Sequence, residues 1–259
     1  MMDTLEACDD SLVDALATMA EWQDGARVVR DSGAISVRGR SRFPTPYSNA
    51  VFPDRDADPG AVLDRADEVL SDRRYFLWTR GADGGKVGAL ARERGFALLD
   101  DLPAMVIEEP IAGVPAPSVE VNRVTDAAGF ADFVRVSQLS YAEAGLPEEI
   151  AVSLLSRPDA AIMSSVIAVG RIEGAPVAAA LSITNALTAV GGVYWVGTVP
   201  SARRRGAADA VTRYVTNAAF ESGALTVVLQ ASPAGTPVYQ RLGYREVGRY
   251  ARFLSPKRG

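Results

Sequence analysis

The stretch from Val199 to Ala208 combines positive charge, small side chains and a turn in a way that suits a bound phosphate group. It follows an apolar run, residues 193–199, that predicts a strand, and it precedes residues with helical spacing. At such a helix start the backbone N–H groups point outward and the helix dipole favours an anion. Arginine side chains would add charge, and small residues would let a diphosphate approach the backbone. The residues concerned are Arg203, Arg204, Arg205, Gly206, Ala207 and Ala208.

The sequence contains no histidine and a single cysteine, Cys8. The lack of histidine removes the commonest general base, the commonest metal ligand and every Ser-His-Asp or Cys-His mechanism. One cysteine cannot form a disulfide framework or a cysteine-based zinc site. The turn at residues 203–208 also lacks the Gly-Lys-Ser/Thr ending of a P-loop and the spaced glycines of a dinucleotide-binding fingerprint. We therefore expect no metal.

The charge and hydropathy pattern indicates a cytoplasmic protein. The chain has 259 residues with a net charge of −5, which disfavours nucleic acid and anionic membranes as partners. It has no apolar run of about 18 residues, the length needed to span a membrane. The first twenty residues are acidic and lack the basic start of a signal peptide. An oligomer remains possible.

The composition of residues 110–118, with three prolines, a glycine and no charge, is typical of a linker. We therefore divide the chain into residues 1–112 and 113–259. In the second part the hydrophobic pattern predicts the order β-α-β-β-β-α-β-α-β. The fold class is mixed α/β, with helices on both faces of a mixed sheet. The predicted strands are 119–124, 165–172, 176–183, 190–199, 225–230 and 246–253.

The pattern of the first part is weaker. It predicts helices at 11–22, 59–70 and 86–94, a hairpin of 27–31 and 34–37, and strands at 75–79, 96–99 and 104–107. Residues 90–96 and 239–244 both read as a short helix that ends in glycine and an aromatic residue before a strand. This local similarity is compatible with a duplicated fold whose first copy has diverged.

The second part, roughly residues 119–253, resembles the GNAT (Gcn5-related N-acetyltransferase) superfamily. The acyl-CoA signature of that superfamily, Gln/Arg-x-x-Gly-x-Gly/Ala, matches Arg203 to Ala208. Its second signature, Asn-x-x-Ala-x-x-x-Tyr-x-x-x-Gly-Phe, is similar to residues 232–244, with Tyr239 and Gly243 in place. Ser232 and Gly235 replace the usual Asn and Ala. The first part lacks the acyl-CoA turn, and by analogy it looks like a smaller, degenerate GNAT-like domain in a tandem arrangement.

The resemblance implies an N-acetyltransferase that moves an acetyl or acyl group from acetyl-CoA to an amine, on a small molecule or a protein, by direct attack in a ternary complex. The strand before the turn would splay from its parallel neighbour, and main-chain groups of Val196 and Thr198 would line the pantetheine arm. The diphosphate would bind at residues 203–208, with Ser232 as a further cofactor contact. Tyr239 would be the catalytic acid that protonates the thiolate.

Several alternatives stay open at this point. The general base could be Glu143, Glu173, Tyr194 or no residue at all. Tyr194 lies two residues from Val196, which would place both on one face of a regular strand, although core packing also explains it. Residues 43–49, rich in proline and aromatics, could form a wall of the acceptor cleft or a surface loop. The alternative function is a non-catalytic acyl-CoA-binding module.

Overall fold

Eleven strands form one mixed sheet in the computed structural model, which describes residues 4–257. Their spatial order is β1-β2-β3-β4-β11-β5-β10-β9-β8-β7-β6. The strands are β1 (Arg27–Asp31), β2 (Ala34–Arg38), β3 (Ala50–Pro53), β4 (Phe76–Arg80), β5 (Ala97–Ile107), β6 (Glu120–Arg123), β7 (Val166–Ile172), β8 (Ala175–Asn185), β9 (Val190–Thr198), β10 (Thr226–Gln230) and β11 (Arg245–Leu254).

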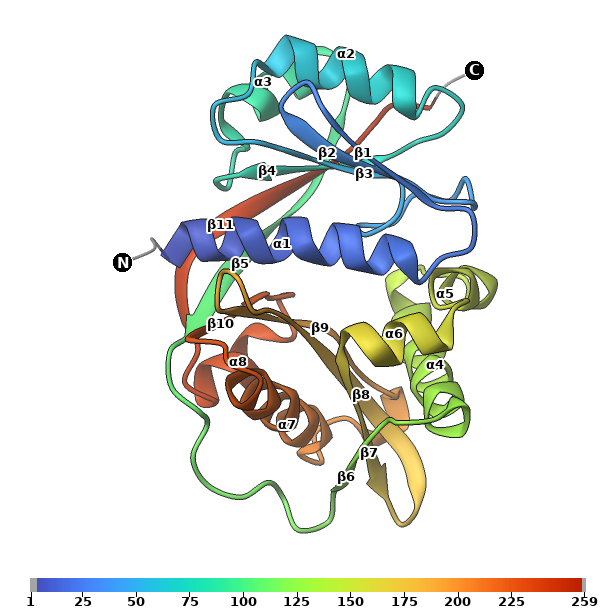
Figure 1. Ribbon diagram of the computed structural model, residues 1–259, viewed down its shortest axis with the longest axis vertical. Helices are drawn as coiled ribbons and strands as arrows, with labels where there is room; N and C mark the ends of the chain where they lie inside the picture. The colour runs from blue at the N-terminus through green and yellow to red at the C-terminus, as the bar shows by residue number, and fades with distance from the viewer. Residues whose placement is uncertain (1–3, 258–259) are drawn as a thin grey trace.

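Helices cover both faces of this sheet (Figure 1). They are α1 (Thr4–Glu21), α2 (Pro59–Val69), α3 (Gly85–Glu93), α4 (Ala127–Tyr141), α5 (Glu148–Leu154), α6 (Pro158–Ser164), α7 (Ala207–Glu221) and α8 (Thr236–Arg241), with short 3₁₀ turns η1 (Ala142–Ala144) and η2 (Pro200–Ala202). In the second half, α7 packs on β7, β8 and β9 from one side, and α4 packs on the same strands from the other. The predicted fold class, a mixed α/β sheet with helices on both faces, is confirmed.

The two halves of the chain repeat the same order of elements. The first half contains β3-α2-β4-α3-β5, and the second contains β9-α7-β10-α8-β11. Within each repeat the two strands joined by the long helix are parallel, β3 to β4 and β9 to β10. Because a parallel pair needs a crossover connection, the helix between its strands must cover the sheet.

The halves exchange their last strands. The C-terminal strand β11 lies between β4 and β5 and is antiparallel to both. In return β5 pairs with β10 of the second half, with Met105 opposite Leu229. The sheet therefore runs without interruption through both halves. The linker at 110–118 forms no helix or strand, and Ile111 is held by Asn217 of α7 at 2.7 Å. A domain division at residues 112/113 stays a prediction.

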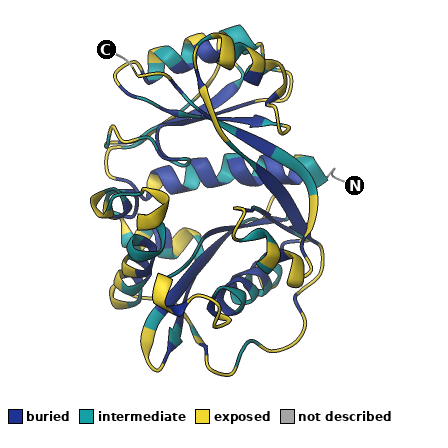
Figure 2. Ribbon diagram, turned by 180° about the vertical axis from the view of Figure 1, so that it is seen from behind, coloured by how far each residue is buried: buried dark blue, intermediate teal, exposed yellow. Residues whose placement is uncertain are grey.

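The first helix fills the space between the halves. Figure 2 shows α1 dark blue along much of its length, where it crosses between the two parts of the sheet. Its Leu12 and Leu16 pack with Trp78, Val228 and Tyr250 in one core cluster. The cluster draws on strands of both halves, so α1 fixes how they face each other. Cys8 is buried in this same cluster and is no exposed thiol.

Most predicted elements exist, and the differences have physical reasons. Residues 97–107 form one strand, β5, where the sequence predicts two, because Asp100 and Asp101 interrupt the apolar pattern while their backbone still pairs with β11. The four-residue strand β3 and the short helices α5 and α6 were not predicted from the sequence. The hairpin about Ser32 and Gly33 is confirmed, with positive φ at both residues.

Candidate functional site

The turn at residues 203–206 forms an exposed corner at the start of α7. Arg204 and Gly206 both adopt left-handed backbone conformations, with φ of 62° and 80°. Gly206 is the N-cap of a 15-residue helix, and no side chain caps it. Within residues 4–257 no acceptor takes the N–H groups of Arg204, Arg205 or Gly206. The corner can therefore offer several N–H donors and the positive end of a helix dipole to an anion.

The strand before this turn leaves its parallel neighbour partway along. Only Val190, Gly191 and Gly192 of β9 pair with β10, so the rest of β9 diverges, and the predicted splay is confirmed. Toward β8 the pairing continues to Val199, whose N–H donates to the Val177 oxygen at 2.9 Å. Since successive residues of a strand point their backbone groups to opposite sides, Val196 and Thr198 direct theirs away from β8. The wedge between β9 and β10 is thus lined by backbone polar groups.

A β-bulge in β9 changes which residues share a face. Trp195 has a φ of 53°, and the register with β8 shifts between Ala179 and Leu181. Tyr194 is paired with Leu181 and Gly197 with Ala179, so Gly197 shares the face of Tyr194. The expectation that Val196 shares that face, which came from a spacing of two, is wrong because a bulge inserts one residue. A Cβ on Gly197 would lie 2.8 Å from the Ser140 Cβ, so this glycine is required by the packing of α4.

Tyr239 lies at the end of the wedge, in α8. Its side chain is 8% exposed, and its ring lies edge-on to Tyr244 with centroids 6.0 Å apart. Gly235 admits this ring, because a Cβ there would meet its Cε2 at 2.7 Å. The exposed Ser232 Oγ accepts the Gly235 N–H at 3.1 Å and so fixes the turn before α8. The hydroxyl proton of Ser232 can still be donated.

Three tyrosines from different elements surround the wedge. Tyr47 comes from the first half, Tyr141 from the end of α4 and Tyr239 from α8. Burial raises the pKa of Tyr47 to about 12. Burial also raises the pKa of Tyr239, and the neighbouring Tyr47 adds to that rise; the pKa of Tyr141 is raised by burial and by both other tyrosines. All three phenols keep their protons near neutral pH. The Tyr141 hydroxyl donates to the Val196 oxygen at 3.0 Å, and those of Tyr47 and Tyr239 can donate to a ligand.

The segment 43–49 is a wall between the halves rather than a loose surface loop. The Trp78 Nε1–H donates to the Pro46 oxygen at 2.8 Å, and the backbones of Thr45 and Ser48 form an isolated antiparallel β-bridge. This holds the Tyr47 ring 5.9 Å from the Tyr194 ring, edge to face. Tyr47 therefore faces β9 across the junction.

Alkaline conditions should destabilise the protein through these buried phenols. Their folded pKa values lie above the unfolded value near 10, so the unfolded chain loses protons first as the pH rises. The contribution of these phenols to the free energy of unfolding should be constant below pH ~10 and fall above it. Urea unfolding at a series of pH values would check this. A Tyr47→Phe variant should show a shallower fall, and equal stability at pH 8 and pH 11 would contradict the prediction.

Several buried polar atoms without partners belong to the elements around the wedge. Within residues 4–257, hydrogen-bonding partners are lacking for side-chain atoms of Ser137, Ser140, Trp195, Thr198 and Gln230, which lie on α4, the end of β9 and the end of β10. A buried polar group without a partner costs free energy. A long ligand with amide groups, such as the pantetheine arm of an acyl-CoA, would supply partners for the atoms at the end of β9. The described residues thus fit both the diphosphate and the arm of such a cosubstrate.

The three candidate bases occupy different places. Glu143 lies against the turn, with its carboxylate 2.7 Å from Arg203 Nη1. Glu173 lies at the tip of the β7–β8 hairpin in a left-handed conformation. Tyr194 is buried, and its hydroxyl lies 2.6 Å from Ser11 Oγ and donates to the Ser11 oxygen at 2.9 Å. Tyr194 thus joins α1 to the sheet, in line with the packing role that the sequence left open.

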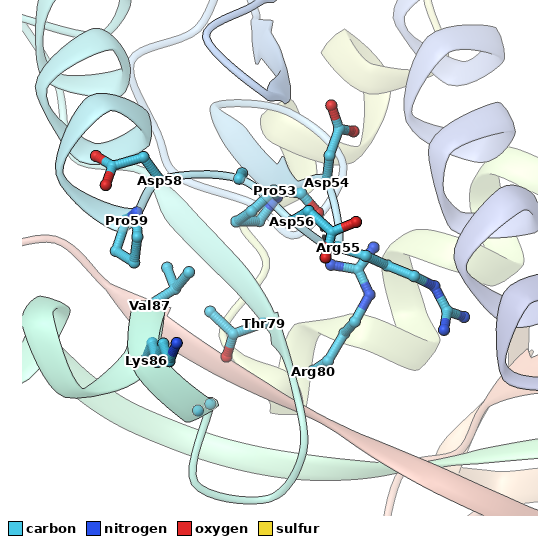
Figure 3. Close-up of a pocket in the computed structure, with 13 residues that line it drawn as sticks. Pro53, Asp54, Arg55, Asp56, Asp58, Pro59, Thr79, Arg80, Lys86 and Val87 are labelled. Carbon is cyan, nitrogen blue, oxygen red and sulfur yellow. Dashed lines mark hydrogen bonds between the residues drawn. The ribbon is translucent and has the colours of Figure 1, made fainter.

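The first half repeats this topology with different chemistry. A hollow of about 580 Å³ lies where β3 and β4 end, between the starts of α2 and α3. Figure 3 shows Asp58 and Pro59 on one side of it and Lys86 and Val87 facing them. The Asp58 carboxylate accepts the Ala61 N–H at 2.8 Å, so the chain caps this helix with its own anion. The absence of an acyl-CoA turn here agrees with the sequence analysis.

Residues 4–257 hold no group of three or more His, Cys, Asp or Glu side chains that could bind a metal. Among the helices of the same residues, none has the length and hydropathy of a membrane span.

Sequence reasoning did not single out Gln230, and it left Tyr47 undecided. The signal for Gln230 was present, because one polar residue ends the otherwise apolar run 227–230 at the carboxyl edge of a parallel strand, where ligands commonly bind. Nothing in the sequence places Tyr47 opposite β9, since that contact depends on α1 and the exchanged strands.

Comparisons with known proteins agree with this geometry. Residues 169–247 match the family model of the acetyltransferase (GNAT) domain. The fold is similar to that of a GCN5-related N-acetyltransferase from Kribbella flavida, with a TM-score of 0.71 and 19% identity over 96% of this chain and 95% of that chain. A GCN5-related N-acetyltransferase from Sphaerobacter thermophilus has a TM-score of 0.61 and 16% identity over 98% and 93% of the two chains.

A third solved structure bears on the repeat. A tandem GNAT protein from the clavulanic acid biosynthesis pathway has a TM-score of 0.60 and 14% identity over 96% of this chain and 97% of that chain. At these identities the likeness concerns the fold, and it extends over both halves. A search of curated proteins finds no match.

Proposed function

Since residues 169–247 match the family model of the GNAT acetyltransferase domain, we propose that the protein transfers an acetyl group from acetyl-CoA to a primary amine by direct attack in a ternary complex. The exposed corner of Arg204 and Gly206 at the start of α7, beside the splayed end of β9, is the observation that carries this proposal. One acyl-CoA would bind per chain, in the second half, because Asp58 occupies the corresponding position in the first.

Each group of residues in the site would have its own role in the reaction. The N–H groups of residues 204–208 bind the diphosphate, and the three arginines surround it. Backbone groups of Val196 and Thr198 hold the pantetheine arm, and one of their N–H groups polarises the thioester carbonyl. The amine nitrogen attacks the carbonyl carbon, a C–N bond forms and the C–S bond breaks. The Tyr239 hydroxyl gives its proton to the departing sulfur and takes one back from water, and the proton lost by the amine passes to water.

The base is best assigned to water. The Glu143 carboxylate forms an ion pair with Arg203, and the Tyr194 hydroxyl donates a hydrogen bond to Ser11. Neither group is therefore directed into the wedge. An amine with a pKa near 8 is partly neutral at pH 7 and needs no strong base, whereas an amine near 10.4 needs one. The proposal therefore favours acceptors with weakly basic amines. The same lack of an aimed base is what favours the second candidate, a module that binds acyl-CoA without turnover.

Two measurements on the purified protein test the proposal. Acetyl-CoA should raise the thermal unfolding temperature in a concentration-dependent way, because it binds only the folded state. Release of free CoA thiol should then depend on an amine from a panel that spans sugars, amino-acid amides and small aliphatic amines. Stabilisation without thiol release would favour the non-catalytic module, and no stabilisation would contradict acyl-CoA binding altogether.

A further inference from the structure

Gln230 ends β10 with an amide group that nothing in the described chain satisfies. Both its Oε1 and its Nε2 are buried and without a hydrogen-bonding partner. Its backbone pairs with Ala104 of β5, and the last residue of β10 that pairs with β9 is Val228, two residues earlier. The amide therefore lies at the open end of the wedge. Leaving two such atoms without partners costs free energy, which indicates that they serve a ligand.

The face on which Gln230 lies follows from its neighbours. Val228 packs with Leu12 and Leu16 of α1, whereas Val227 and Leu229 belong to another core cluster. Because alternate residues of a strand share a face, Gln230 points to the same side as Val228. Tyr47 packs against that same cluster from the first half. The amide thus faces the junction between the halves.

Gln230 is close in the sequence to the residues at the reacting end of the site. Two residues further on, Ser232 fixes the turn that positions Gly235, and Gly235 contacts the Tyr239 ring. Tyr239 in turn lies near enough to Tyr47 for the Tyr47 phenol to raise its pKa. The polar groups named here are hydroxyls and one amide, all neutral near pH 7, and the guanidinium of Arg252, which acts on the Tyr47 phenol, is paired with Asp100.

From this arrangement we infer that Gln230 recognises the acceptor, and that the acceptor carries a neutral group able both to donate and to accept a hydrogen bond next to its amine. A hydroxyl or a carboxamide has this property, and a glutamine amide can pair with either through its N–H and its oxygen. The inference rests on the proposed function. Such a neighbour also lowers the basicity of an amine, which suits a site without a strong base.

Matched pairs of amines test this inference in the acetyl-CoA assay. The hydroxyl arm compares ethanolamine with propylamine and glucosamine with cyclohexylamine, and the amide arm compares glycinamide with isobutylamine. The wild-type protein should prefer the polar member of at least one arm by tenfold or more in kcat/KM. The arm in which this occurs identifies which neighbouring group the site reads.

The variant Gln230→Leu should reduce that preference at least tenfold while the Kd for acetyl-CoA stays the same. Its free energy of unfolding should not fall, because the amide has no protein partner to lose, and a structural role would lower it. Gln240→Leu, the same change at an exposed position of α8, should leave both preference and binding unchanged.

Two results would overturn the assignment of Gln230. An increase in the Kd for acetyl-CoA in Gln230→Leu would place the amide on the pantetheine arm instead. Acetyl-CoA binding without any preference for the polar amines would contradict the proposed acceptor class but not the proposed acetyl-CoA site. Failure of the wild-type protein to bind acetyl-CoA would contradict the proposed function, and this inference with it.

Discussion

Replacement of Arg204 and Gly206 together by glutamate is expected to weaken acetyl-CoA binding at least a hundredfold. The change removes one guanidinium and places two carboxylates where the diphosphate would bind. A charge-assisted hydrogen bond contributes about 1.5–3 kcal/mol, and a hundredfold change in Kd corresponds to about 2.7 kcal/mol. Gly206 also has a φ of 80°, and a Cβ there would lie 3.0 Å from the Ala116 Cβ, so glutamate would displace the corner itself. Isothermal titration with acetyl-CoA measures the effect.

A matched control separates lost binding from lost folding. Arg27→Glu with Gly223→Glu makes the same change in net charge and also replaces a left-handed glycine, whose φ is 96° and whose Cβ would meet no atom within 4 Å. Both positions are exposed, and Gly223 follows the other end of α7. The control should bind acetyl-CoA like the wild type. Unchanged binding in the Arg204 and Gly206 double variant would contradict a diphosphate site at this corner.

The elements of the second half could be predicted because each carries its own local signal. Asp126 caps α4 by accepting the Gly129 N–H at 2.8 Å, Gly223 follows the end of α7, and the apolar run 226–230 forms the strand parallel to β9. These signals depend on neighbours in the sequence. The corner at residues 203–206 could be predicted for the same reason, because its arginines and Gly206 are adjacent in the sequence and directly precede helix α7.

The exchange of strands between the halves could not be predicted. The alternation of β11 indicates a strand but does not say that it lies beside β4, since an apolar face fits many partners. The pairing is set by contacts distant in sequence: Tyr250 donates to Asp9 of α1 at 2.6 Å, and Arg80 of β4 binds the same carboxylate at 2.7 Å. Asp9 is 5% exposed, so these groups offset the cost of burying its charge.

The parts of the site that sequence reasoning missed have the same origin. The bulge at Trp195 reverses the face expected for Val196, and a register shift of one residue leaves no trace in composition. Tyr47 reaches the wedge because α1 joins the halves, partly through the hydroxyl of Tyr194. The acceptor side thus depends on packing between the halves, whereas the cosubstrate side depends on one local turn.

Replacement of Tyr239 by phenylalanine should lower kcat about a hundredfold, the lower end of what a positioned general acid contributes. The ring would still fill the space beside Gly235, so the Kd for acetyl-CoA should not change. Burial raises the pKa of Tyr239, so the phenol stays protonated and can donate a hydrogen bond to the departing sulfur, but the same rise makes it a weaker acid than the thiol. Steady-state kinetics with an acceptor identified in the amine panel provides the measurement.

The neighbouring tyrosine supplies the control for this prediction. Tyr244→Phe removes the hydroxyl of another buried tyrosine, which lies 2.7 Å from Thr216 Oγ1 and whose ring packs edge-on against Tyr239. Its loss should cost about 1 kcal/mol of stability, as for an ordinary hydrogen bond, and leave kcat unchanged. If both variants lose activity in proportion to stability, Tyr239 acts through packing. If Tyr239→Phe retains full kcat, the proton reaches the sulfur from water, and the wedge catalyses by positioning alone.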